Sequence, residues 1–413
     1  MTMPRSMALN ACRSCAETNL DLILNLGTTP LADRLLRKDQ LGQPEPAFPL
    51  EVVFCPRCTL VQIRETVAPE VLFDADYPYF SSFSRYLLEH SARNVEELIR
   101  MRRLGPKSFV VELASNDGYL LRNYVAAGIP VLGIDPVPGV ARAAQKVGVP
   151  TLVKFFTGDL AEQMAANGQR TDVLHANNVL AHVADTNGFV AGIHTLLKDD
   201  GVAVIEAPYL RDLVEHCEFD TIYHEHLCYF SVTALDHLFR RHDLYLNDVR
   251  RLPIHGGSLR LFVERREKVQ DHVLALLEEE RKLGMNRIDY YRDFSARVGQ
   301  LKGALIAMLQ DLKSRGKRIA AYGAAAKGAT LINYVGIGPE LVEFVVDRNI
   351  HKQGLFMPGQ RIPIYAPERI LQEKPDYVLL LPWNLESEIL QQESAFREAG
   401  GRFIIPVPVP RIV

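Results

Sequence analysis

The segment at residues 109–118 reads Phe-Val-Val-Glu-Leu-Ala-Ser-Asn-Asp-Gly, an apolar strand that leads into an acidic residue and a loop of small and amide side chains. A second apolar strand, 131–134, ends on Asp135, 17 residues beyond Gly118. In a βαβ unit of this kind the loop passes under an adenosine-bearing cofactor, and the distant acid accepts hydrogen bonds from the ribose. The pattern predicts an α/β domain with a cofactor at the carboxyl ends of its strands.

The loop departs from the dinucleotide fingerprint, because Gly118 is its only glycine. A diphosphate needs bare backbone N–H groups without nearby negative charge, whereas Glu112 and Asp117 are acidic. These acids suit a cationic or zwitterionic ligand, and S-adenosylmethionine, with its sulfonium and amino acid tail, fits. We expect this cofactor to be bound by Glu112, Ala114, Asn116, Gly118, Asp135 and Asn177. An ordinary tight turn between strand and helix is the alternative.

Length and composition indicate a globular protein of more than one domain. A chain of 413 residues should hold two or three domains, and 47% hydrophobic with 23% charged residues is ordinary for a globular protein. A net charge of −3 gives no electrostatic case for nucleic-acid binding. No apolar run approaches the ~20 residues that span a bilayer, and the N-terminus has no apolar signal core. We expect a cytoplasmic, monomeric enzyme with no nucleic-acid or membrane partner.

Four of the six cysteines form two Cys-x-x-Cys pairs, Cys12 with Cys15 and Cys55 with Cys58. Two such knuckles can present four thiolates to one zinc ion in a tetrahedral site. The 39 residues between the pairs exceed the usual spacing, so a small subdomain lies between them. Redox pairs or disulfides are the alternatives, although a cytoplasmic setting disfavours persistent disulfides. A site with four protein ligands has no open position, so we expect the zinc to be structural.

The chain divides into three parts. Residues 1–75 should form the zinc-binding module, with strands at 22–26, 50–54 and 60–63 and a turn at 27–30. Residues 76–266 should form the cofactor domain, with a helix at 84–103 and strands near 109–113, 131–135, 151–154, 172–177, 202–206, 245–251 and 258–264. The segment 252–257 is too short for a helical crossover, so the last two strands should be antiparallel. Five parallel strands ending in an antiparallel pair are typical of the class I methyltransferase Rossmann-like fold.

Residues 267–413 should form a helical bridge followed by a C-terminal Rossmann-like domain. A strand at 318–322 leads into Gly-Ala-Ala-Ala-Lys-Gly at 323–328, and a strand at 341–346 ends on Asp347. Lys327 at the start of a helix could hold a substrate phosphate. A structural turn without a ligand is an equally good interpretation.

Tyr-His-Glu-His at residues 223–226 is the densest cluster of titratable side chains. It follows a predicted strand end, where open α/β sheets bind ligands. His224 and His226 share a face only on an extended segment and lack an obvious third ligand, so a general base is a better interpretation than a metal site. His182, which follows another strand end, is a second polar candidate. Tyr77, Tyr79 and Ser82 lie near the domain junction and could contact a sugar or phosphate.

Taken together, the double Cys-x-x-Cys, the Glu-x-Ala-Ser-Asn-Asp-Gly loop and Tyr-x-Glu-His before Gly-Ala-Ala-Ala-Lys-Gly resemble one family over essentially the whole chain. That family is the zinc-containing, S-adenosylmethionine-dependent deoxysugar C-methyltransferases of antibiotic biosynthesis, with the D-tetronitrose type nearest. The resemblance implies methylation at C-3' of a dTDP-linked 4-keto-deoxysugar through an enolate. The nearest type carries a 3'-amino group, and relatives of the mycarose type carry a 3'-hydroxyl.

The resemblance also implies roles for individual residues. It makes His226 the base, with Tyr223 and Glu225 beside it, and it places Tyr77 and His182 in the sugar pocket. From the residues alone, Glu225 is expected to polarise His226. The alternatives are an NAD(P)-dependent nucleotide-sugar oxidoreductase that uses the C-terminal unit, and a non-catalytic zinc-bearing scaffold.

Overall fold

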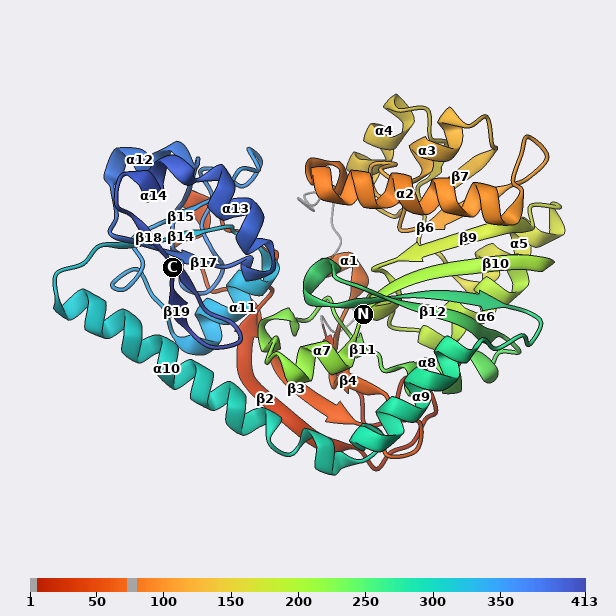
Figure 1. The fold of residues 1–413 in the computed structure, drawn as a ribbon, viewed down its shortest axis with the longest axis horizontal. Helices are drawn as coiled ribbons and strands as arrows, with labels where there is room; N and C mark the ends of the chain where they lie inside the picture. The colour runs from red at the N-terminus through yellow and green to blue at the C-terminus, as the bar shows by residue number, and fades with distance from the viewer. Residues whose placement is uncertain (1–5, 73–79) are drawn as a thin grey trace.

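A computed structural model describes residues 6–72 and 80–413, except for the side chain of His255. Tyr77 and Tyr79 therefore lie outside the described residues. Three sheets of four, seven and six strands carry the fold, and a two-stranded pair joins β1 (Ser6–Ala8) to β5 (Glu65–Val67). In Figure 1 the seven-stranded and six-stranded units stand apart at the two sides, and the N-terminal strands lie below and between them.

The four-stranded sheet has the order β11-β4-β3-β2 and is antiparallel throughout. Its strands are β2 (Asp21–Pro30), β3 (Ala47–Phe54), β4 (Val61–Ile63) and β11 (Cys228–Tyr229). The predicted hairpin around Cys55 and Cys58 is present as β3 and β4. The last strand, β11, comes from a distant part of the chain, so the sheet of the N-terminal module is completed by a later segment.

The turn predicted at residues 27–30 is wrong, because β2 continues through it to Pro30. The pairing of β2 with β3 shifts between Asn25 and Thr28. Gly27 has a φ of 80°, and its N–H donates to Asn25 Oδ1 at 2.7 Å. The glycine thus forms a bulge that bends the strand without ending it.

The seven-stranded sheet has the order β12-β13-β10-β9-β6-β7-β8. Its parallel strands are β6 (Val110–Leu113), β7 (Val131–Ile134), β8 (Thr151–Leu152), β9 (Thr171–Asn177) and β10 (Leu197–Pro208). β13 (Ser258–Glu264) is antiparallel to both β10 and β12 (Tyr245–Leu252). The predicted antiparallel pair is therefore confirmed, and β13 is inserted between β10 and β12.

Helices cover both faces of this sheet, because its strands are apolar on both sides. Buried residues of α2 (Arg85–Arg102), α3 (Leu121–Ala126) and α4 (Pro138–Lys146) pack on one face. Those of α5 (Gly158–Ala166), α6 (Thr186–Leu196) and α8 (Val232–Arg240) pack on the other. The predicted helix at 84–103 is α2, whose N-cap Ser84 accepts a hydrogen bond from Leu87 N–H.

Two helices, α9 (Asp271–Leu283) and α10 (Phe294–Ser314), form the predicted bridge. The C-terminal sheet follows in the order β16-β15-β14-β17-β18-β19, parallel except for its last strand. Its strands are β14 (Ile319–Tyr322), β15 (Val345–Val346), β16 (Ile364–Tyr365), β17 (Tyr377–Leu380), β18 (Arg402–Ile405) and β19 (Arg411–Ile412). α11 (Ala326–Val335) follows β14, and α12 (Glu368–Glu373), α13 (Glu386–Gln392) and α14 (Ser394–Glu398) complete this Rossmann-like unit. Among the residues that the structure describes, no helix is long and apolar enough to cross a membrane.

Candidate active site

The Tyr-His-Glu-His segment at 223–226 lies between the single helical turn η4 (Phe219–Thr221) and β11. β11 pairs with β4 of the N-terminal sheet, with Cys228 opposite Gln62, and Ile63 N–H donates to Leu227 O at 3.0 Å. On the other side, Leu227 N–H donates to Ala181 O at 2.7 Å. The segment is therefore held between the zinc-binding module and the loop that follows β9.

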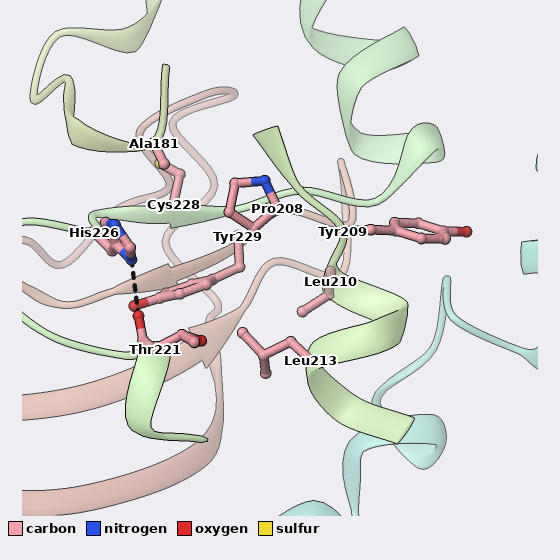
Figure 2. A pocket seen from close by; sticks show the side chains of 9 residues that line it. All are labelled: Ala181, Pro208, Tyr209, Leu210, Leu213, Thr221, His226, Cys228 and Tyr229. Atoms are coloured by element: carbon pink, nitrogen blue, oxygen red, sulfur yellow. Dashed lines mark hydrogen bonds between the residues drawn. The ribbon is translucent and has the colours of Figure 1, made fainter. Parts of the chain in front are cut away.

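His226 has a defined orientation. Its Nδ1 lies 2.8 Å from the carbonyl oxygen of Thr221 (Figure 2), and its Nε2 lies 2.9 Å from the Tyr223 hydroxyl. A carbonyl oxygen only accepts, so Nδ1 carries the proton, and in the neutral ring Nε2 holds the lone pair. The edge of the His182 ring meets His226 with centroids 4.7 Å apart. The structure thus brings His226, Tyr223 and His182 together, and their roles in a reaction stay predictions.

Glu225 does not orient His226 as predicted, because Thr221 and Tyr223 hold the two ring nitrogens. Its side chain is 3% exposed, and burial, reinforced by the carboxylate of Asp33, raises its pKa to about 8. At neutral pH Glu225 is therefore mainly a neutral acid. Thr221 and Asp33 were missed in the sequence, because neither belongs to a motif that marks it.

His182 is suited to remain uncharged beside His226. Removal of its ring from water lowers the pKa of His182 to about 4. A small cavity lies against His226 and Thr221, and its wall is mainly apolar: Ala181, Pro208, Tyr209, Leu210, Leu213, Cys228 and Tyr229 (Figure 2). Because His182 stays neutral, a proton taken up by His226 is not repelled by a second imidazolium beside it.

The loop after β6 has an unusual backbone for its sequence. Ala114 and Asn116 adopt left-handed φ values of 55° and 50°, and Gly118 has a φ of 79°. Non-glycine residues in this region carry strain of ~1–3 kcal/mol that often marks a ligand site. Asp135 supports the loop, since its carboxylate accepts hydrogen bonds from Asn116 N–H and Val137 N–H, both at 2.9 Å. Its remaining lone pairs are the ones available to a ribose.

Several buried acceptors around this loop lack a hydrogen-bond partner among the described residues. They are Glu112 Oε2, Asp117 Oδ1 and Asn177 Oδ1, at the ends of β6 and β9. Burial, followed by the neighbouring Asp135, Asp117 and Glu206, holds the pKa of Glu112 well above its usual range. Unpaired acceptors without a balancing cation fit the positively charged sulfur and ammonium groups of S-adenosylmethionine.

Ser82 contacts this cofactor loop through its backbone. The N–H groups of Ser81 and Ser82 donate to Asn116 Oδ1 at 2.9 Å and to Asp117 Oδ2 at 3.1 Å. The substrate contact predicted for the Ser82 side chain stays a prediction. The same holds for Tyr77 and Tyr79, which the structure does not describe.

Lys327 is engaged by protein groups. Its ammonium donates to Asn384 Oδ1 at 2.7 Å and lies 4.7 Å from the centre of the Trp383 ring. Burial lowers the pKa of Lys327, and the nearby Asp220 and Glu218 oppose that shift. Two acidic neighbours disfavour a phosphate, so this geometry does not support the phosphate contact predicted for Lys327.

The four cysteines Cys12, Cys15, Cys55 and Cys58 form one cluster, with all Sγ atoms within 4.8 Å of one another. Cys12 and Cys58 are 3.5 Å apart at sulfur, as are Cys15 and Cys55, which excludes disulfide bonds. Zinc–thiolate bonds of about 2.3 Å place tetrahedral ligands at about this spacing. Burial raises the pKa of Cys55 to about 12, so a cation is needed to hold thiolates here. The cluster fits a zinc ion.

This sheet order, with polar side chains gathered at the ends of β6, β7 and β9, defines a methyltransferase of the class I fold that carries a zinc-binding module. Three family models match successive parts of the chain: "Putative zinc binding domain" at residues 12–73, methyltransferase domain at 84–249 and C-methyltransferase C-terminal domain at 253–408. The C-methyltransferase NovU of Streptomyces niveus is 36% identical over 408 residues, 98% of this chain and 97% of NovU. The chain belongs to this family of C-methyltransferases.

Two further similar proteins cover less of the chain. A ubiquinone biosynthesis O-methyltransferase of Azorhizobium caulinodans is 26% identical over 117 residues, 28% of this chain and 44% of that protein. The magnesium protoporphyrin IX methyltransferase of Synechocystis PCC 6803, solved with S-adenosylhomocysteine, is 17% identical with a TM-score of 0.35 and covers 43% of this chain and 83% of that one. The family assignment rests on the first relative and the family models, and it favours methyl transfer over the oxidoreductase alternative.

Proposed function

We propose that the chain transfers a methyl group from S-adenosylmethionine to C-3' of a dTDP-linked 4-keto-deoxysugar, with His226 as the general base. The observation that carries this proposal is the hydrogen bond from His226 Nδ1–H to Thr221 O, at 2.8 Å. It places the ring's lone pair on Nε2, where it accepts a hydrogen bond from the Tyr223 hydroxyl at 2.9 Å, at the carboxyl edge of the parallel sheet, where the fold binds its ligands. Membership of the C-methyltransferase family supports methylation of a carbon atom. The resemblance in sequence motifs supports a deoxysugar as the substrate.

The His226 imidazole has a clear task in such a reaction. A C–H bond beside a ketone is a weak acid, and a positioned base contributes ~10²–10⁴-fold to its ionisation. His226 Nε2 takes the C-3' proton, and the electron pair of the C–H bond moves into the ring to give an enolate with its charge on O-4'. The hydroxyl of Tyr223, 2.9 Å from this nitrogen, is the neighbour that the sugar would have to displace.

Tyr223 supplies the donor that the enolate oxygen needs. Its hydroxyl lies 2.9 Å from His226 Nε2, so it can turn from the imidazole to O-4' when the sugar enters and stabilise the developing charge. The bound cofactor supplies an electrophilic methyl group on a positively charged sulfur. Transfer of that methyl group to C-3' would break its bond to sulfur, leave S-adenosylhomocysteine and restore the ketone, after which His226 would return its proton to water.

The zinc-binding module holds this machinery in place. β4 pairs with β11 directly after the catalytic segment, so the metal stabilises the position of residues 223–226 and needs no contact with the substrate. Glu225, a buried acid next to Asp33 of that module, stands where the two parts meet.

Mass spectrometry of the chain with trideuteromethyl-labelled S-adenosylmethionine tests the proposal. The panel should hold dTDP-4-keto-deoxysugars with a 3'-amino or a 3'-hydroxyl group, each paired with its 4'-hydroxy form. We expect label at C-3' of a 4-keto sugar and none in its reduced partner, because only the ketone acidifies the C–H bond. Label on oxygen or nitrogen, or equal labelling of the reduced sugars, would contradict the proposal.

A further inference from the structure

The turn η4 (Phe219–Thr221) holds the carbonyl that orients His226, yet it is too short to be stable alone. Its own bonds are few: Thr221 N–H and Thr221 Oγ1 donate to Glu218 O at 3.1 and 2.7 Å, and Ile222 N–H donates to Phe219 O at 3.0 Å. A single helical turn fixes several dihedral angles for little hydrogen bonding. Its position must therefore come from contacts with other elements.

The C-terminal unit supplies two of those contacts. The Phe219 ring is fully buried and packs on Tyr334 of α11 with centroids 5.2 Å apart. Asp220, also fully buried, accepts a hydrogen bond of 2.7 Å from the indole N–H of Trp383. The side chains of Phe219 and Asp220, the two residues of the turn before Thr221, are thus anchored to the C-terminal unit.

Lys327 completes this anchor. Its ammonium lies over the Trp383 ring at 4.7 Å and donates to the adjacent Asn384. A cation over an indole face fixes the ring, and the same cation balances the Asp220 carboxylate, whose pKa burial raises only to about 6. The attraction of Lys327 and the hydrogen bond from Trp383 N–H both favour the ionised form of Asp220, which is the stronger acceptor.

We propose that Trp383 is a positioning residue for the catalytic base: through Asp220 it holds η4, so that the Thr221 carbonyl fixes His226 in the tautomer with its lone pair on Nε2. This inference rests on the proposed role of His226. It assigns to the C-terminal unit a part in the chemical step that is separate from any contact with substrate.

Trp383→Phe tests this assignment, because it keeps an aromatic side chain near Lys327 and removes the N–H donor together with part of the indole ring. We expect kcat to fall about tenfold, within the ~10²-fold that a misplacement of about 1 Å can cost. The KM for the sugar and the Kd for S-adenosylhomocysteine should stay within about twofold of the parent values. In protein with ¹⁵N-labelled histidine, the Nδ1 proton signal of His226 should broaden or shift. Leu385→Ala changes an exposed residue of the helical turn that contains Trp383, η7 (Trp383–Leu385). It is the matched control and should change none of these.

Three results would overturn the inference. The first is an unchanged kcat, and the second is an unchanged His226 signal. The third is a common fall of kcat, sugar affinity, cofactor affinity and thermal midpoint, which would show that Trp383 only stabilises the packing between units. If the parent chain methylates no sugar of the panel, the proposed function fails instead. The His226 signal in Trp383→Phe then still decides whether Trp383 positions that ring.

Discussion

The Nδ1 atom of His226 lies 2.8 Å from the carbonyl oxygen of Thr221, which makes Nε2 the basic nitrogen of the ring. Asn in place of His226 removes that base and keeps a polar side chain of similar size. We expect His226→Asn to lower kcat by ~10²–10⁴-fold and to leave S-adenosylhomocysteine binding nearly unchanged by calorimetry. The same variant should stop exchange of the C-3' hydrogen with deuterated water. The exposed His272 supplies a control, His272→Asn, with parent behaviour expected. Exchange of the C-3' hydrogen at the parent rate in His226→Asn would show that His226 is not the base.

Glu225 predicts a dependence of stability on pH. Its pKa is raised to about 8 from an ordinary value near 4.5, so between these values the folded chain keeps a proton that the unfolded chain releases. Folding stability therefore falls as the pH rises through this range. Glu225→Gln cannot ionise, so its free energy of unfolding relative to the parent should rise between pH 5 and pH 8.5 by on the order of 1 kcal/mol for each pH unit. The difference between the two thermal midpoints, measured across this range, checks the trend. The exposed Glu398→Gln should show no such trend. A constant difference between parent and Glu225→Gln across the range would contradict the raised pKa.

Glu112 should affect cofactor affinity and stability in opposite directions. The carboxylate is 1% exposed, has an unpaired oxygen and has only acidic groups acting on it. Glu112→Gln removes a carboxyl group whose ionised form a cationic ligand would stabilise. We expect the Kd for S-adenosylmethionine to rise ~10–100-fold, as for loss of a charged hydrogen bond, while the thermal midpoint of the ligand-free chain stays level or rises. Affinity at the parent level would place the cofactor away from this carboxylate.

Removal of one zinc ligand should lower activity, because the pairing of β4 with β11 connects the zinc-binding module to the candidate active site. Cys58→Ser weakens a site whose metal contributes directly to folding, so we expect less than one zinc per chain by elemental mass spectrometry and a thermal midpoint lowered by several degrees. Methyl transfer should fall as well, because Gln62 in β4 pairs with Cys228 beside the catalytic segment. Cys217→Ser changes a buried cysteine outside the cluster and should keep its zinc. Full zinc content in Cys58→Ser would show that Cys58 is not a ligand.

Features that depend on local pattern were predictable from the sequence alone. The predicted strand at 258–264 matches β13, and the helix at 84–103 matches α2 within one residue at each end. Spacing within a knuckle or a βαβ unit is a short-range property, so the cysteine cluster and the cofactor loop with Asp135 also follow from it. Hydrophobic periodicity and motif spacing thus determined the three-part α/β architecture and the residue types of its site.

Tertiary structure alone decided how those residues act. The partner of His226 Nδ1 is a backbone carbonyl, and any residue type at position 221 would offer one, so no motif marks Thr221. The pairing of β11 with β4, the approach of Asp33 to Glu225 and the bond between Trp383 and Asp220 join segments that are far apart in sequence. Such contacts depend on how three units pack against one another. The sequence therefore determined which chemical groups the protein carries, while packing between its units decided the tautomer, charge and position in which they are presented.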